Sequence, residues 1–292
     1  MKKMYLKTLM ILVVMFGLAF SSCDNGANGA KGNTGPTPIH EWLLDGSGTD
    51  SAGGKDLTLN TAGYVSFETD PDMGRSVLFV NGKDGTANAN SGVVADNWNA
   101  AWVPDFNGPS SWTGFTASAW IKPKDIDGLR QILMFELPND TNAGVYILCF
   151  DSDFLYLGYA GGGGDGSYGA CMDYMYSGPD YLQYDDSGNL IPTWMHIALT
   201  YKGSTVALYV NGEKVGERTG TLPGAIWWDA SGVPSGVGAQ VDIPIKAPTI
   251  DSFWIGGRRP TQFYVGYISD VRLYDRALSD SEIKTQASNF NN

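Results

Sequence analysis

The near lack of helical periodicity before residue 275 is the feature that most constrains the fold of this chain. Short apolar or alternating runs recur instead, and Gly, Asp, Asn or Pro residues separate them. Alternation of apolar and polar residues indicates strands with one buried face, and frequent turn residues indicate short connections between strands. The 38 glycines, together with an excess of Asp over Glu, favour turns over helices. The sequence therefore predicts an all-β fold.

The clearest strand signal is the stretch "TWMHIALTYKGSTVALYVNGEKVGERTG", which runs from Thr193 to Gly220. Its Asn211-Gly212 pair is typical of a tight hairpin in which both central residues have positive φ. After the last apolar run, Ser279 and Glu282 have the spacing of a helix capping box. We expect an antiparallel two-sheet β-sandwich of the jelly-roll type with a short C-terminal helix, formed as one domain by residues 39–292.

The beginning of the chain has the pattern of an export signal. Three early lysines precede Leu9–Phe20, an apolar run without charge, and two small serines and Cys23 follow it. This order is typical of a signal peptide, which we assign to residues 1–22. The apolar run would extend about 18 Å as a helix, less than the ~30 Å hydrocarbon core of a bilayer, so a permanent spanning helix is the weaker interpretation.

A cysteine directly after the cut site resembles the lipobox of bacterial lipoproteins. In that family the cysteine sulfur receives a diacylglycerol, so the resemblance implies a lipid on Cys23 and anchoring to the bacterial cell envelope through that lipid alone. Phe20 stands where the family usually has Leu. The alternative is an ordinary secretory peptide with an incidental cysteine.

Residues 23–38 contain four Gly-x-y triplets, "GANGAKGNTGPT", with Pro36 as their only proline. A collagen triple helix needs many such repeats and much proline, so these triplets do not predict one. With few apolar side chains to bury, the segment is expected to be a disordered, flexible tether.

Charge and cysteine content limit the partners. The net charge of −12 disfavours nucleic acid and anionic membrane surfaces. Besides Cys23, the chain has Cys149 and Cys171, which could pair outside the cytoplasm. The sequence does not establish that they are close, so a disulfide stays open.

Four blocks of the chain, taken together and in order, resemble the laminin G-like, pentraxin-type jelly roll of the concanavalin A-like lectin/glucanase superfamily. The resemblance covers about residues 41–283 and implies two antiparallel sheets, often a structural Ca²⁺, and glycan or protein ligands. The blocks are "EWLLDGSGTDSAGG", "FTASAWIKP", "WMHIALTYKGSTVALYVNGEKVG" and "FWIGGRRPTQFYVGYISDVRLYDRALSDSEI".

The same resemblance places the ion where the loop after the first strand meets the last strand. Asp45 and Asp50 lie in that loop, and Asp270 lies in the late strand. Ca²⁺ takes about six to eight oxygen ligands, a mixture that carboxylates and the carbonyls of a Gly-rich loop can supply. The alternative is that these are ordinary turn and capping aspartates.

Two long segments, 161–192 and 220–248, look like functional loops on a rigid sandwich. Aromatic rings can stack on sugar rings, and neighbouring carboxylates can accept hydrogen bonds from hydroxyl groups. The alternative is that the aromatic residues seal the loops onto the sandwich. The candidate ligand-binding residues are Tyr174, Tyr176, Tyr181, Tyr184, Trp227, Trp228 and Asp229.

No catalytic constellation is evident. Most glycosidases need two carboxylates that flank the scissile bond, and the Glu-x-Asp-x-x-Glu motif of the laminarinase-like enzymes is absent. Asp151 and Asp153 are the nearest candidates, and we interpret them as a solvent-facing strand end. The sequence thus predicts a lipid-anchored binding protein of the cell envelope, with carbohydrate as the leading ligand. The alternatives are a protein-binding adhesin or scaffold and a glycoside hydrolase without the usual motif.

Overall fold

The computed structural model describes residues 35–59, 65–81, 101–103, 106, 113–126, 129–136, 145–151, 154–162, 168–177, 181–228, 241–245, 252–257 and 264–290. A compact unit runs from Thr34 to Asn292. Pro38, which the sequence analysis assigns to the tether, is buried. The folded body therefore begins a few residues before the expected boundary, because this proline packs instead of remaining in solvent.

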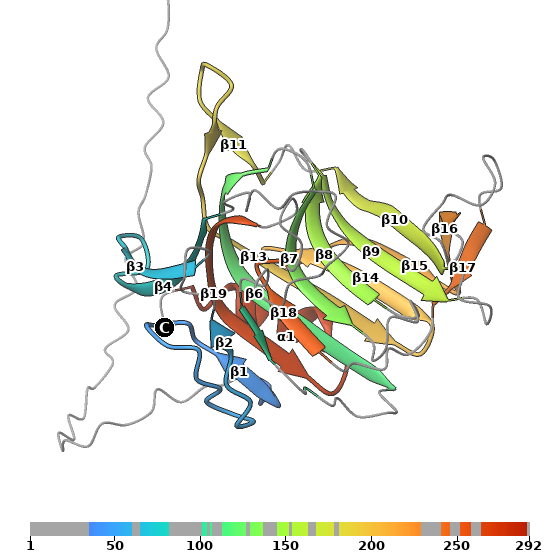
Figure 1. Ribbon diagram of the computed structural model, residues 1–292, viewed down its shortest axis with the longest axis horizontal. Coiled ribbons are helices and arrows are strands. Elements are labelled where there is room, and N and C mark those ends of the chain that lie inside the picture. The colour runs from blue at the N-terminus through green and yellow to red at the C-terminus, as the bar shows by residue number, and fades with distance from the viewer. Residues whose placement is uncertain are drawn as a thin grey trace, which may run out of the picture. The chain divides into compact units, whose positions relative to one another are not determined.

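Two large antiparallel sheets make up the body (Figure 1). The first has eight strands, in the order β15-β14-β13-β6-β19-β4-β3, with β1 paired to β19 outside this path. Its strands are β1 (His40–Trp42), β3 (Val65–Asp70), β4 (Arg75–Asn81), β6 (Gly114–Asp125), β13 (Met195–Lys202), β14 (Thr205–Val210), β15 (Glu213–Thr219) and β19 (Val265–Tyr274).

The second sheet has nine strands, in the order β17-β16-β10-β9-β8-β7-β18-β5-β2. A separate hairpin pairs β11 (Gln183–Tyr184) with β12 (Leu190–Ile191). The strands of the nine-stranded sheet are β2 (Thr58–Leu59), β5 (Ala101–Val103), β7 (Leu129–Glu136), β8 (Val145–Asp151), β9 (Phe154–Gly162), β10 (Tyr168–Ser177), β16 (Thr221–Trp228), β17 (Val241–Pro244) and β18 (Ser252–Ile255).

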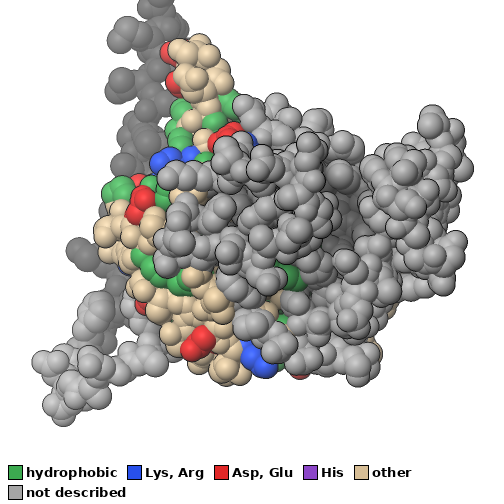
Figure 2. Space-filling model, viewed as in Figure 1, with side chains coloured by type: hydrophobic (Ala, Val, Ile, Leu, Met, Phe, Trp, Pro, Cys, Tyr) green, Lys and Arg blue, Asp and Glu red, His purple; other side chains and the backbone are tan. Residues whose placement is uncertain are grey.

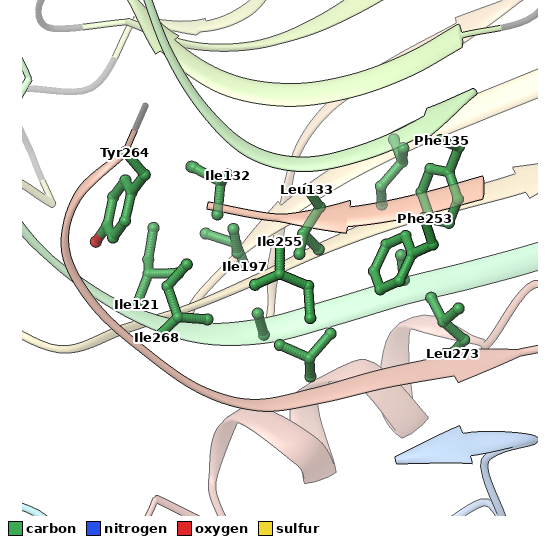
Figure 3. Packing of buried hydrophobic residues seen from close by; sticks show 14 of the residues in the cluster. Ile121, Ile132, Leu133, Phe135, Ile197, Phe253, Ile255, Tyr264, Ile268 and Leu273 are labelled. Carbon is green, nitrogen blue, oxygen red and sulfur yellow. The ribbon is translucent and has the colours of Figure 1, made fainter. Parts of the chain in front are cut away.

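The apolar core lies between the two sheets. Alternate residues of β6, such as Ala119 and Ile121, are buried there together with Ile268 of β19. Phe253 and Ile255 of β18 belong to the same cluster from the opposite sheet. Figure 3 shows the side chains of Ile121, Ile268 and Ile255 close to one another between the ribbons. The period-two alternation read from the sequence is therefore the alternation of core-facing and outward-facing residues.

The outward-facing side of the eight-stranded sheet is partly covered by helix α1 (Asp280–Ala287). Ile283 of the helix is fully buried and packs in one cluster with Tyr209 and Tyr274 of the sheet. The capping box predicted from Ser279 and Glu282 is present. Its two reciprocal bonds satisfy backbone donors that the first turn of a helix otherwise leaves unpaired.

The predicted Asn211-Gly212 turn is confirmed, with φ values of 49° and 84°. The prediction of two long loops is wrong, because both segments contain paired strands. Segment 161–192 includes β10 and the β11–β12 hairpin, and segment 220–248 includes β16 and β17. Pairing with neighbouring strands outweighs the turn-rich composition from which the loops were expected.

The predicted fold class is confirmed: an all-β, antiparallel two-sheet sandwich with one short helix in the described residues. None of the helices in the described part of the chain is both long enough and apolar enough to cross a membrane.

Candidate functional site

Outward-facing side chains of neighbouring strands form a mixed aromatic and charged surface beside the part that α1 covers. Strands β6, β19, β4 and β3 are adjacent in the sheet, so residues distant in sequence meet there. We call this surface the outer-face patch; its members are Glu68, Asp70, Asp72, Phe79, Lys122, Lys124, Trp194 and Tyr267.

Asp70 at the end of β3 anchors the patch. Its side chain is almost fully buried, and its Oδ1 accepts hydrogen bonds from Trp194 Nε1 at 2.9 Å and from the Met73 backbone N–H at 3.0 Å. Its Oδ2 accepts from Lys122 Nζ at 2.8 Å. Burial raises the pKa of Asp70, but the hydrogen bonds from Lys122, Trp194 and Met73 outweigh it, so the pKa is lowered. Asp70 is therefore a fixed carboxylate.

Lys122 is the cation that balances this carboxylate. Its Nζ also donates to Asp72 Oδ2 at 2.7 Å, and it lies 5.9 Å from the ring centroid of Trp194 and 5.8 Å from that of Tyr267. Burial lowers the pKa of Lys122, but the two aspartates outweigh that effect and the pKa is raised. Lys122 therefore stays charged and holds the turn after β3 against the sheet.

The more open part of the patch is built on two rings. Phe79 of β4 and Tyr267 of β19 are half-buried, with centroids 5.0 Å apart. The exposed Lys124 has its Nζ 5.0 Å from the Phe79 centroid and 5.3 Å from the Tyr267 centroid. Tyr267 Oη donates to Glu68 Oε2 at 3.0 Å. Two rings are thus flanked by an ammonium group and a carboxylate.

The rings continue toward the end of the chain. The Tyr267 centroid lies 6.4 Å from Trp194, and Phe290 lies 6.1 Å from Trp194 and 4.7 Å from Trp120. We call these five rings the aromatic row: Phe79, Tyr267, Trp194, Phe290 and Trp120. A surface of this kind can stack on apolar ligand faces and exchange hydrogen bonds with ligand hydroxyl groups.

The sequence analysis missed this patch. The rings and lysines on the strands stand next to buried residues, as Lys122 does next to Ile121 and Tyr267 next to Ile268. Period-two alternation could have identified these outward-facing residues. It could not have shown that β3, β4, β6 and β19 are neighbours, because the pairing joins distant parts of the chain.

Two of the three aspartates expected to bind calcium, Asp50 and Asp270, have protein partners for their carboxylate oxygens. Asp50 is buried, and its Oδ1 accepts from the backbone N–H groups of Glu41 at 2.9 Å and Gly53 at 2.9 Å. Its Oδ2 accepts from the Lys55 N–H at 2.9 Å and lies 2.6 Å from His40 Nδ1. Burial raises the pKa of Asp50, but these hydrogen bonds outweigh it and the pKa is lowered. The carboxylate organises its own loop.

Asp270 is held by arginine side chains. It forms an ion pair with Arg75 and a longer one with Arg272, whose guanidinium lies 3.4 Å away. Asp45 is exposed. In the described residues no three His, Cys, Asp or Glu side chains gather into a group that could hold a metal. As arranged, the three aspartates do not fit a calcium site, because N–H donors and guanidinium groups occupy Asp50 and Asp270.

Two of the predicted ligand-binding residues lie on a strand. Trp227 and Trp228 end strand β16, opposite Gly169 and Tyr168 of β10, so they lie in a strand instead of a loop. The bulky aromatic and apolar residues around them favour a strand, which corrects the loop expectation. Their side chains, and all of Asp229, lie outside the described residues.

Tyr174 and Tyr176 lie near the C-terminal end of β10, whereas Trp227 pairs with Gly169 near its N-terminal end. Only their backbone is described. Tyr181 packs against the core, whereas Tyr184 in the β11–β12 hairpin is exposed. The hairpin and the backbone of β16 lie apart in Figure 1, and a shared site for the seven residues stays a prediction.

Strand register also contradicts the possible disulfide. Cys149 in β8 is opposite Tyr156 of β9, and Cys171 in β10 is opposite Tyr159 of β9. The two cysteines are two strand spacings apart, which is about 9.6 Å, whereas a disulfide requires Cα atoms within about 7 Å. A bond between them does not fit this sheet. Cys23 lies outside the described residues.

Comparison with known proteins agrees with this architecture. Residues 99–243 match the family model described as Concanavalin A-like lectin/glucanases superfamily. The search of curated proteins found no match. Domain 4 of AbnA, a GH43 extracellular arabinanase from Geobacillus stearothermophilus solved with arabinotriose, has a TM-score of 0.54 at 16% identity, covering 87% of this chain and 99% of that one.

Two further solved structures share the fold. The binding domain of Paraclostridial Mosquitocidal Protein 1 has a TM-score of 0.51 at 15% identity, with 85% of this chain and 51% of that chain covered. Trypanosoma rangeli sialidase in complex with the inhibitor DANA has a TM-score of 0.51 at 19% identity, with 89% and 35% covered. This chain thus spans about half of the first protein and about a third of the second. Residues 99–243 of this chain are therefore similar to the Concanavalin A-like lectin/glucanases superfamily.

Proposed function

We propose that this protein binds carbohydrate through the outer-face patch and is held at the bacterial cell envelope by a lipid on Cys23. The observation that carries the proposal is the half-buried ring pair of Phe79 and Tyr267, flanked by Glu68 and Lys124. Aromatic platforms with a few convergent polar groups are a common means of holding small ligands in orientation. This platform lies on strands, which fix its geometry better than loops would.

Sugars suit these groups. The C–H faces of a sugar ring can pack on the rings of Phe79 and Tyr267, while its hydroxyl groups can donate to Glu68 and accept from Lys124. In the described residues Lys124 forms no ion pair with an acidic side chain, so its ammonium group is available to a ligand. Figure 2 shows a few separate acidic and basic side chains on the described part of one face.

The arabinanase domain that was solved with arabinotriose is a similar fold found with an oligosaccharide. Its identity of 16% is too low to transfer a ligand, but it gives a reason to include arabinose oligomers among the probes.

Binding is favoured over hydrolysis at this patch. Glu68 and Asp70, two of the three carboxylates of the patch, stand two residues apart on β3. A glycosidase needs one carboxylic acid with a raised pKa to protonate the leaving group. The pKa of Asp70 is lowered, and its oxygens are occupied by Lys122 and Trp194.

The first test is a glycan array with the compact unit Thr34–Asn292, run with Ca²⁺ and again with a chelator. We expect binding to sugar that Phe79→Ala with Tyr267→Ala abolishes and that Trp227→Ala with Trp228→Ala preserves. Loss only in the tryptophan variant would move the site to β16. A blank array with a well-folded protein would reject glycan binding and favour a protein partner. Shortened products would identify a hydrolase.

Calcium and the lipid anchor need their own measurements. A thermal melt in Ca²⁺ and in chelator is expected to give the same Tm, because arginine and N–H donors occupy the aspartates. A rise in Tm with Ca²⁺ would restore the calcium prediction. For the anchor, the full chain is expressed in a bacterium fed labelled palmitate. We expect label in the wild type and none in Cys23→Ser.

A further inference from the structure

Phe290 covers two tryptophans at one end of the aromatic row. It follows α1 by three residues and lies 4.7 Å from the Trp120 centroid and 6.1 Å from that of Trp194. Trp120 is buried, and Trp194 is half-buried. The ring of Phe290 therefore lies where the ring of a ligand would lie if the ligand contacted both Trp194 and Trp120.

Two polar atoms without partners lie near Trp120, on its own strand and on the strand paired with it. His196 is opposite Trp120 on the neighbouring strand, with its ring 5.3 Å away and nearly edge-on. Its Nδ1 is buried and has no hydrogen-bond partner among the described residues, and the same holds for Ser118 Oγ. His196 is paired with Trp120, and Ala198 is paired with Ser118. Ser118 and His196 are therefore diagonal neighbours on the two paired strands. Such groups normally have a protein, water or ligand partner.

His196 is suited to hydrogen bonding without charge. Burial, helped by the charge of Arg272, lowers the pKa of His196 to about 3, so the imidazole is neutral at ordinary pH. A neutral imidazole nitrogen can donate or accept, and the Ser118 hydroxyl can do both. Sugar hydroxyl groups have the same dual capacity. Aromatic walls with neutral polar groups beside them match a sugar ring better than an ion or an alkyl chain.

We propose that Trp120 and Trp194 form a second saccharide subsite, which Phe290 occupies in the free protein and leaves when a longer glycan binds. The inference rests on the proposed function, because the glycan that displaces Phe290 is one already held at Phe79 and Tyr267. Phe290 then limits the length of glycan that the site recognises.

Displacing Phe290 costs binding energy, and so its removal should favour long ligands over short ones. An aromatic contact of this kind corresponds to roughly a two- to tenfold change in affinity. The probes are ladders of arabino-, xylo- and gluco-oligosaccharides from two to six units, titrated by calorimetry into the unit Thr34–Asn292.

For Phe290→Ala we expect roughly a two- to tenfold gain in affinity for the longest oligomers and no change for the shortest. Phe290→Trp keeps a ring in place and should behave as the wild type. Adding Trp120→Leu to Phe290→Ala should remove the gain. Tyr184→Ala, which changes an exposed aromatic residue of the β11–β12 hairpin, is the matched control and should change nothing.

The outcomes separate the two proposals. If the wild type binds no ladder and no arrayed glycan, carbohydrate binding at the patch is rejected and this inference with it. If the wild type binds but Phe290→Ala has the same length dependence, or loses affinity at every length while its Tm is unchanged, only the second subsite is overturned. If Phe290→Ala does not fold, Phe290→Leu replaces it with the same expectation.

Discussion

The outward side of the eight-stranded sheet has two halves, which differ in how far their aromatic side chains are exposed. Where α1 covers it, Tyr209 and Tyr274 pack with Ile283 into a closed apolar cluster. Beside the helix, Phe79 and Tyr267 stay half-buried, and charged side chains surround them. Aromatic rings meet a carboxylate and an ammonium group in both halves, since Tyr209 contacts Asp280 and Lys214, but the Tyr209 ring is buried. Aromatic content therefore does not by itself mark a site; exposure together with directed polar groups does.

The largest expected effect is in the covered half. Ile283→Ala removes a fully buried side chain from the interface between helix and sheet. We expect a loss of about 2–5 kcal/mol in the free energy of unfolding, measured by denaturant titration. Glycan affinity per folded molecule should stay unchanged. A parallel loss of affinity in the folded fraction would mean that the halves are not independent.

Asp70→Asn should have the next largest effect, since it leaves Lys122 with Asp72 as its only carboxylate partner. We expect a loss of about 1–3 kcal/mol at pH 7. The pKa of Asp70 is lowered from 3.8, so its contribution is complete above that value and disappears as the pH falls through the folded pKa. The difference between wild type and variant should therefore shrink in strong acid. A difference that stays constant down to pH 2 would contradict this assignment.

In the open half, Tyr267→Phe removes the hydroxyl group that donates to Glu68. We expect a change in stability of about 0.5–1.5 kcal/mol, since the bond is partly exposed. Glycan affinity should fall, because Glu68 loses the group that orients it. Lys124→Met is the companion variant, and it should weaken binding with little change in Tm. If Tyr267→Phe and Lys124→Met both keep the wild-type glycan affinity, the open half covers the sheet but does not bind glycan.

The smallest effect is expected at the β11–β12 hairpin. Tyr184→Ala changes an exposed side chain, so stability should change by less than about 0.5 kcal/mol and glycan binding should be unaffected. A clear loss of binding would return the site to the segment that the sequence analysis first favoured.

The fold was predictable because its signals are local. Alternation along a strand, the Asn211-Gly212 turn and the Ser279–Glu282 capping box each depend on neighbouring residues. The candidate site was not predictable, because Glu68, Lys124 and Tyr267 meet only through strand pairing across most of the chain. The partners of Asp50 and Asp270 could not be read from the sequence for a related reason. Their spacing suits a metal, but His40 and Arg75 determine what their oxygens bind.

Strand β19 has a consequence for how the chain reaches this fold. It lies between β6 and β4 and also pairs with β1, although it is the last strand in the sequence. The middle of the eight-stranded sheet is therefore missing until nearly the whole chain has been made. Folding dominated by such distant contacts is slow, because the entropy of closing long loops is lost before the contacts form. Until β19 joins them, β6 and β4 keep unpaired edges, and unpaired edges of this kind favour aggregation.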